Sequence, residues 1–200
     1  MQLNNLTAIS PIDGRYRKKL EILSNYFSEF ALIKYRVFVE IQYFIALWEL
    51  EIPQLSKLSK KSVKNIEQIF LGFSIEDAMY IKEIEEKINH DVKAVEYFIK
   101  DKFDELGLSK FKEFVHFGLT SQDINNTAIP LILKNFTTDY YLNKLFEVRN
   151  ELQVLIEKCE GVSVLARTHG QPASPTKLDK EIKVFKVRID EQIKILKNNL

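Results

Sequence analysis

The sequence predicts an all-α protein, and three observations carry that prediction. Six glycines and five prolines stand among 200 residues, about half the average usage of these two helix breakers. Between them, apolar residues recur every three or four positions, which is the spacing of one face of a helix. No segment alternates between apolar and polar residues over a sustained length, so a sheet is not expected. At most, a short extended piece lies around residues 162–166.

The predicted helices follow one another along the chain. A long first segment carries apolar residues from Leu20 to Trp48, with one polar interruption at Lys34. Two shorter segments cover residues 75–88 and 92–106, and a looser apolar seam runs from Ile124 to Cys159. Each of these segments shows the three-to-four-residue period of an amphipathic helix.

Two features complicate this simple order of helices. Pro130 falls inside the seam from Ile124 to Cys159, where we expect it to remove a backbone hydrogen bond and kink the helix. The last seam, from Leu178 to Leu200, has a near-heptad spacing, and neither Gly nor Pro closes it. We therefore expect the 200 residues to be the N-terminal part of a longer protein.

Composition excludes several classes of protein. Lys and Arg number 29 against 28 Asp and Glu, which leaves no basic excess for non-specific nucleic-acid binding. The single cysteine excludes an internal disulfide and a cysteine-based zinc site, and it fits a reducing compartment. The N-terminus lacks the pattern of a secretory signal, and the most apolar stretch, Phe38 to Leu50, is broken by Glu40, Gln42 and Glu49. We expect a soluble protein of the cytoplasm.

His90 lies between two predicted helices. Asn89 suits the left-handed end of the first helix, and Asp91 suits the N-cap of the second. Spacing alone therefore explains the segment as a helix junction with an exposed histidine. Because His90 and Asp91 are sequence neighbours, their side chains point in different directions, and we do not expect them to form a hydrogen-bonded dyad.

His116 precedes a second helix start. Thr120 with Asp123 matches a Thr-x-x-Asp start signal, and Ser121 is an equally good cap. A helix N-terminus with two hydroxyls also suits a phosphate or carboxylate. Both interpretations stay open here, and His116 taken alone is more typical of a hydrogen-bonded structural histidine.

His169 lies in a segment that glycine and proline keep out of helix. Gly170 and Pro172 follow it, so we expect a fixed irregular turn. Turns carried by rigid helices often present catalytic groups, and a histidine exchanges protons near neutral pH. An incidental loop histidine explains the residue equally well.

Near the start, Arg15 and Tyr16 follow Gly14 in a polar turn. The planar guanidinium of Arg15 suits a phosphate, and Tyr16 adds a hydroxyl beside it, although an ordinary surface turn has the same composition. The three histidines are separated by 26 and 53 residues, which resembles no metal-ligand spacing, so we predict no metal site.

Four segments of the chain stand out together: SPIDGRY at 10–16, NHDVKAVEY at 89–97, HFGLTSQDINN at 116–126 and RTHGQPA at 167–173. In this order they resemble segments of the bacterial adenylosuccinate lyases, within the fumarase/aspartase superfamily. Each is weak by itself. Together they span the chain and are specific to this family.

The resemblance implies an all-α homotetramer in which active sites are shared between subunits. Residues 1–115 would form a small N-terminal helical domain, and 116–200 would begin the central helical bundle, truncated at its C-terminal end. The family eliminates fumarate from adenylosuccinate, giving AMP, and from the succinylated aminoimidazole-carboxamide ribotide. It requires neither a metal nor an organic cofactor.

The resemblance also implies roles for individual residues. His169 would be the general acid that protonates the leaving nitrogen, and His116 the second active-site histidine. The remaining residues would bind substrate: Arg15 and Tyr16 at the phosphate, and His90, Asp91, Val92, Thr120 and Ser121 at the nucleotide and succinyl groups.

One departure from the family matters. Its mobile loop, of the form Gly-Ser-Ser-x-Met-Pro-x-Lys-x-Asn-Pro, supplies the serine base and does not occur among these 200 residues. We therefore expect the 200 residues alone to be inactive. Two alternatives stay open: a non-catalytic or nucleotide-binding helical paralogue, and a related fumarate-releasing lyase such as argininosuccinate lyase, against which SPIDGRY and NHDVKAVEY argue.

Overall fold

A computed structural model describes residues 2–200 of the chain. Helix accounts for 72% of the residues and strand for 7%, so the predicted all-α class is confirmed. The chain forms two compact units, Met1–Leu133 and Lys134–Leu200, and each is described by itself below. The expected domain boundary after residue 115 stays a prediction. None of the described helices is both long and apolar enough to cross a membrane.

The first unit contains the predicted N-terminal helices in the predicted order. Its α-helices are α1 (Arg17–Leu20), α2 (Ser24–Phe27), α3 (Glu29–Glu49), α4 (Lys60–Leu71), α5 (Ile75–Ile88), α6 (Asp91–Glu105) and the larger part of α7 (Ser121–Phe136). A short 3₁₀ turn, Pro11–Asp13, precedes α1, and others lie between the helices at Glu21–Leu23, Pro53–Leu55 and Ser109–Phe114. The predicted segment from Leu20 to Trp48 is thus divided between α2 and α3, which follow the turn Glu21–Leu23. Ser28 separates the two helices, because its side chain accepts a hydrogen bond from the N–H of Ala31 and starts α3.

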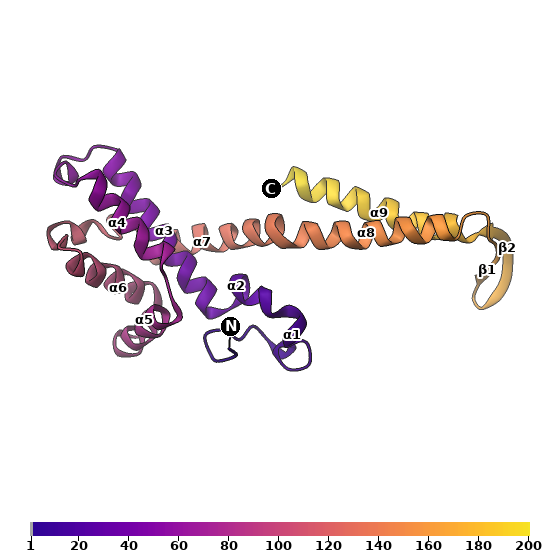
Figure 1. The fold of residues 1–200 in the computed structure, drawn as a ribbon, viewed down its shortest axis with the longest axis horizontal. Coiled ribbons are helices and arrows are strands. Elements are labelled where there is room, and N and C mark those ends of the chain that lie inside the picture. The colour runs from indigo at the N-terminus through magenta and orange to yellow at the C-terminus, as the bar shows by residue number, and fades with distance from the viewer. Residues whose placement is uncertain (1) are drawn as a thin grey trace. The chain divides into compact units, whose positions relative to one another are not determined.

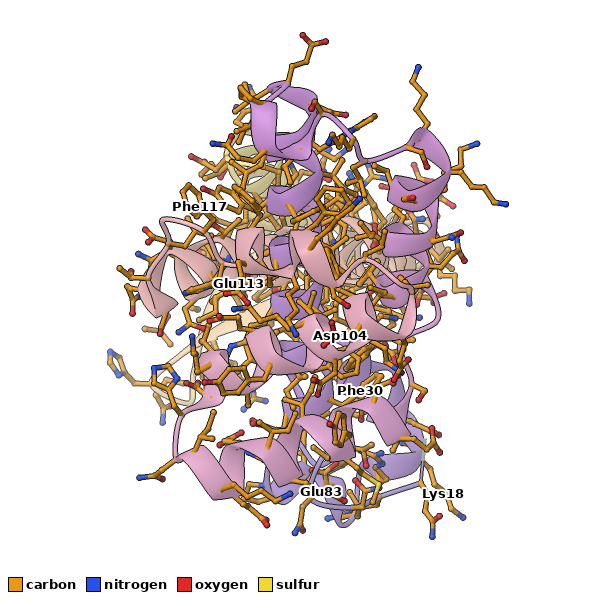
Figure 2. All side chains as sticks on the ribbon, turned by 90° about the vertical axis from the view of Figure 1, so that its left-hand side faces the viewer. Lys18, Phe30, Glu83, Asp104, Glu113 and Phe117 are labelled. Carbon is orange, nitrogen blue, oxygen red and sulfur yellow. The ribbon has the colours of Figure 1, made fainter. Side chains whose placement is uncertain are left out.

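Helix α3 is the centre of the first unit. It packs against α4, α5 and α6, which lie alongside it in Figure 1. Phe44 of α3 meets Phe103 of α6 edge to face, with 4.9 Å between ring centroids, and both side chains are buried. Figure 2 shows Phe30 within this packed interior, whereas Lys18 lies at the edge of the unit.

The junction between α5 and α6 corrects one expectation. Asn89 ends α5 in the left-handed conformation, with φ of 57°, as predicted. The N-cap of α6 is His90 and not Asp91, because the His90 ring accepts a hydrogen bond from the backbone N–H of Lys93. Asp91 is the first residue of the helix, which frees its carboxylate for a different partner.

Helix α7 runs through Pro130 without interruption. A π-helical turn, Thr137–Tyr141, follows it and leads into α8 (Leu142–Lys158). The second unit then continues with β1 (Ser163–Thr168), β2 (Gln171–Lys177) and α9 (Leu178–Asn198). Helices α8 and α9 lie side by side, and Asp190 of α9 accepts a 2.9 Å hydrogen bond from Arg149 Nε.

The prediction that no sheet forms is wrong for this unit. Strands β1 and β2 pair antiparallel, from Ser163 opposite Lys177 to Thr168 opposite Gln171. Both faces of this two-stranded ribbon are largely exposed. No buried face therefore imposes the alternation of apolar and polar residues that identifies a strand in a sequence. The extended piece expected around 162–166 is the first strand of the hairpin.

Truncating Phe103 to alanine should destabilise the first unit by about 3–5 kcal/mol, because it removes a fully buried ring and its edge-to-face partner contact. Urea unfolding followed by the fluorescence of Trp48, the single tryptophan of the chain, measures this loss. Leu50→Ala is the control, since Leu50 is 74% exposed and its truncation should change stability by less than about 0.5 kcal/mol. Equal shifts for the two variants would contradict the described core.

Candidate functional site

Two helix starts meet in the first unit. One is the start of α6 at His90, and the other is the start of α7 at Ser121. The Oγ of Ser121 lies 3.4 Å from Nε2 of His90, which joins two segments that are 31 residues apart in the sequence. The structure thus brings together the two junctions that the sequence singled out.

The contacts of His90 fix the position of its ring proton. Nδ1 accepts the backbone N–H of Lys93 at 3.1 Å, so in the neutral ring the proton sits on Nε2 and points toward Ser121. Nδ1 lies 3.8 Å from Oδ1 of Asp91, beyond hydrogen-bond distance. The expectation that these neighbours do not form a hydrogen-bonded dyad is confirmed.

A buried arginine connects three helices at this junction. Nη2 of Arg36, on α3, lies 2.7 Å from Oδ2 of Asp91 at the start of α6. Its Nε donates a 2.9 Å hydrogen bond to Oδ1 of Asn125 on α7. Partial burial raises the pKa of Asp91, but the N–H of Val92 and the guanidinium of Arg36 outweigh burial and hold that pKa below its ordinary value.

An apolar layer lies beneath the junction. Val39 of α3, Val92 of α6, and Ile124 and Ala128 of α7 form one buried cluster. Because the side chain of Val92 is fully buried, this residue can contribute to a binding site only through its backbone. The layer fixes how the two helix starts sit on α3.

His116 is held by a buried glutamate. Its Nδ1 lies 2.5 Å from Oε1 of Glu40 on α3, and the Glu40 side chain is fully buried. Burial raises the pKa of Glu40 and outweighs the opposing effect of His116. The next residue is also tied to α3, because the hydroxyl of Tyr43 donates a 2.8 Å hydrogen bond to the carbonyl of Phe117.

The predicted start signal of α7 is confirmed in part. The carboxylate of Asp123 accepts hydrogen bonds from the backbone N–H of Thr120 at 2.7 Å and from the Thr120 hydroxyl at 2.9 Å. These hydrogen bonds lower the pKa of Asp123. Ser121 is the first residue of the helix, so its hydroxyl remains beside His90.

Arg15 and Tyr16 lie in the turn before α1 and are both exposed. The guanidinium of Arg15 stands over the Tyr16 ring, 5.4 Å from its centroid. Among the described residues, no hydrogen bond or ion pair joins either side chain to the His90 junction. The turn itself is held by Asp13, which pairs with Arg17 Nη1 at 2.7 Å.

His169 belongs to the second unit and lies at the tip of the β1–β2 hairpin. Its φ is 52° and that of Gly170 is 77°, which gives a two-residue turn with positive φ at both positions. Such turns match the twist of the flanking strands. The predicted irregular turn is therefore a regular hairpin turn, and it leaves His169 exposed.

Sequence reasoning did not single out three residues at these junctions as site residues, namely Arg36, Glu40 and Asn125. In the sequence, Glu40 stands out only as a break in an apolar stretch. A stronger signal was present, because Arg36 and Glu40 lie four residues apart on a helix whose neighbouring positions are apolar. Charged side chains are rarely fully buried without a partner.

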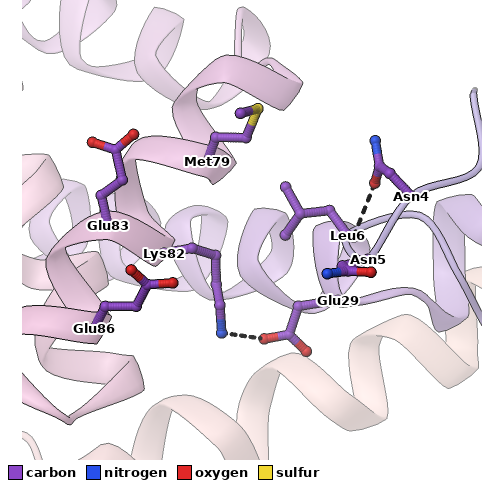
Figure 3. Close-up of a pocket in the computed structure, with 8 residues that line it drawn as sticks. All are labelled: Asn4, Asn5, Leu6, Glu29, Met79, Lys82, Glu83 and Glu86. Carbon is purple, nitrogen blue, oxygen red and sulfur yellow. Dashed lines mark hydrogen bonds and ion pairs between the residues drawn. The ribbon is translucent and has the colours of Figure 1, made fainter.

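A groove elsewhere on the first unit contains none of the predicted site residues (Figure 3). It is lined by Asn4, Asn5, Leu6, Glu29, Met79, Lys82, Glu83 and Glu86. Lys82 pairs with Glu29 at 3.4 Å and with Glu85 at 2.7 Å. Its ammonium group is thus already paired with carboxylates of the protein.

Asp91→Asn should change how stability depends on pH. Because the folded-state pKa of Asp91 is lowered, its contribution is complete above the unfolded value of about 3.8–3.9 and disappears as pH falls below it toward the folded pKa. Urea unfolding at a series of pH values from about 6 to about 3 should show the chain and the variant converging in acid. A gap that stays constant over this range would contradict the ion pair with Arg36.

Comparison with known proteins gives one consistent result. A protein named adenylosuccinate lyase from Dictyostelium discoideum is 50% identical over 205 residues, covering 100% of this chain and 44% of that relative. A protein of the same name from Buchnera aphidicola (subsp. Schizaphis graminum) is 44% identical over 199 residues, covering 98% of this chain and 44% of that relative. A protein of the same name from Escherichia coli is 39% identical over 198 residues, covering 98% of this chain and 43% of that relative.

The chain thus spans less than half the length of the curated relatives that it matches. The matches to these relatives cover 98–100% of the chain, which confirms the resemblance seen in the sequence motifs. The family model described as lyase matches residues 14–200. The chain therefore belongs to the lyase family.

Proposed function

We propose that the chain supplies part of the active site of an adenylosuccinate lyase, which eliminates fumarate from adenylosuccinate to give AMP. The succinylated aminoimidazole-carboxamide ribotide is proposed as its second substrate. One observation carries the proposal: in a chain whose relatives bear this name, His90, Asp91 and Ser121 gather at one junction of two helix starts.

The junction suits a substrate that carries carboxylates and a phosphate. The starts of α6 and α7 bring the positive ends of their helix dipoles to the junction. His90 adds an Nε2–H and Ser121 a hydroxyl. Fixed donors of this kind stabilise the negative charge that builds on a carboxylate when the neighbouring C–H loses its proton.

The exposed turn at Arg15 suits the phosphate. A guanidinium donates two parallel hydrogen bonds to phosphate oxygens, and the Tyr16 ring beneath it limits its freedom. Asp13 and Arg17 hold the turn without using Arg15. We place the phosphate contact here, remote from the bond that breaks.

His169 supports the second half of the reaction. The C–N bond breaks readily only if the leaving nitrogen receives a proton, and an exposed imidazole at a rigid hairpin tip can deliver one at neutral pH. We assign the general-acid role to His169 and a supporting role in the site to His116.

The proposal includes the family's assembly. The enzyme is a homotetramer of the cytoplasm whose sites combine residues from several subunits, and it uses neither a metal nor an organic cofactor. The serine base comes from the signature loop, which the 200 residues do not contain.

The test uses this chain followed by the remaining C-terminal part of the Dictyostelium discoideum relative, called the joined enzyme below. We expect the joined enzyme to release fumarate from adenylosuccinate and the 200-residue chain alone to release none. Release from argininosuccinate instead would favour a different lyase. Nucleotide binding by a folded joined enzyme without turnover would favour the non-catalytic paralogue.

In the joined enzyme, Arg15→Ala should weaken the binding of substrate more than it slows the chemical step. The loss of a charge-assisted contact costs about 1.5–3 kcal/mol and should appear mainly in KM. Lys18→Ala is the matched control, because Lys18 is exposed three residues away and should leave KM unchanged. A large fall in kcat with an unchanged KM would place Arg15 at the reacting end.

His169→Asn should lower turnover by about 10²–10⁴-fold, the usual loss when a general acid is removed. Asparagine is chosen because Asn-Gly is favoured in a turn with two positive φ values, so the hairpin should be preserved. Steady-state kinetics and substrate binding measure the two effects separately. If the variant kept more than about a tenth of the unsubstituted turnover, His169 would not be the general acid, and His90 or His116 would be assigned that role instead.

A further inference from the structure

Glu40 is buried in a way that packing does not explain. Its side chain is fully buried on α3, and among residues 2–200 none is hydrogen-bonded to Oε2. A carboxyl group taken out of water destabilises a fold unless it is fully hydrogen-bonded. A residue retained under that penalty is a candidate for a functional role.

A neighbouring glutamate shows the contrast. Glu96 of α6 is also almost fully buried, but two ammonium groups surround it, with Lys93 at 2.8 Å and Lys100 at 3.1 Å. Burial raises the pKa of Glu96, and the two lysines outweigh burial and lower it. Glu96 therefore has the contacts of a structural ion-pair network, whereas the hydrogen bonds described for Glu40 come from His116.

The contact with Glu40 determines which ring nitrogen of His116 is available to another group. Nδ1 points at the buried carboxylate, so Nε2 is the atom left for another partner, and no described residue pairs with it. His116 also has a φ of 59°, an uncommon conformation for a residue other than glycine. The hydrogen bond between its ring and Glu40 helps to hold His116 in that backbone conformation.

We propose that Glu40 is a positioning residue that keeps the proton of His116 on Nδ1 and presents a bare Nε2 to the substrate. An ionised carboxylate only accepts hydrogen bonds, so the contact with Oε1 of Glu40 places the proton of a neutral His116 ring on Nδ1. This inference rests on the proposed function, which places His116 in the site.

The Nε2 atoms of the two histidines in the first unit then have opposite hydrogen-bonding roles. His90 uses Nδ1 as an acceptor for Lys93 N–H and exposes an Nε2–H donor. His116 uses Nδ1 as a donor to Glu40 and exposes an Nε2 acceptor. A substrate with both an anionic group and a polarised N–H or O–H group is matched by such a pair.

The first experiment is ¹⁵N NMR of histidine side chains in the 200-residue chain, which contains three histidines. At a pH above the titration of all three, His116 should be the Nδ1–H tautomer and His90 the Nε2–H tautomer. His116→Gln and His90→Asn variants assign the signals. An Nε2–H tautomer for His116 in the unsubstituted chain would overturn the proposal, with no variant needed.

Three substitutions separate positioning from structural support. Glu40→Leu should convert His116 to the Nε2–H tautomer while the urea midpoint stays the same or rises, because a buried carboxyl is removed. Glu40→Gln keeps an acceptor oxygen and should retain the Nδ1–H tautomer. Glu96→Gln is the matched control and should lower the midpoint without changing His116. A lower midpoint with an unchanged tautomer in Glu40→Leu would assign Glu40 a structural role only.

Activity provides an independent readout. In the joined enzyme, Glu40→Leu should lower kcat/KM at least tenfold, and Glu40→Gln should recover most of it. If the unsubstituted joined enzyme releases no fumarate, the proposed function fails while the NMR result still decides whether Glu40 positions His116. Full activity in Glu40→Leu with a changed tautomer would overturn the link between positioning and catalysis.

Discussion

The candidate site depends on a buried guanidinium. Arg36 lies inside the first unit, and a charge in that position is tolerated only when the surrounding groups pair with it. Asp91 and Asn125 provide the partners from two different helices. The need to satisfy one buried charge of α3 therefore fixes how the starts of α6 and α7 sit on α3. These two helix starts carry the groups that we propose to bind the substrate.

The same helix carries the second constraint four residues later. Arg36 and Glu40 do not pair with each other; each reaches a different junction, at His90–Asp91 and at His116 respectively. Apolar residues of the three helices pack between these polar contacts. Helix α3 thus holds two junctions through polar contacts. Arg36 positions the segment that bears His90, and Glu40 positions the segment that bears His116.

Local chemistry made part of this arrangement predictable. Asn89 was expected to end α5 and the Thr120–Asp123 pair to start α7, because these are decided within a few residues. The polar partners of α3 could not be predicted in this way, because Arg36 contacts Asn125, 89 residues away in the sequence, and Glu40 contacts His116, 76 residues away. The N-cap was misplaced by one residue because a histidine ring took the role usually given to Asp. The hairpin at His169 was missed because it buries neither face. The family resemblance, in contrast, rests on four short motifs spread along the chain, three of which contain a histidine.

A double-mutant cycle on Arg36 and Asp91 tests the central claim most directly. Urea unfolding of the unsubstituted chain, Arg36→Met, Asp91→Asn and the double variant yields their coupling free energy, with Trp48 fluorescence reporting on the first unit. If the buried guanidinium holds the start of α6, the coupling should be at least about 1 kcal/mol, within the range for residues in direct contact. Effects that add to within about 0.3–0.5 kcal/mol would show that the two side chains act independently, and the junction would then need a different anchor.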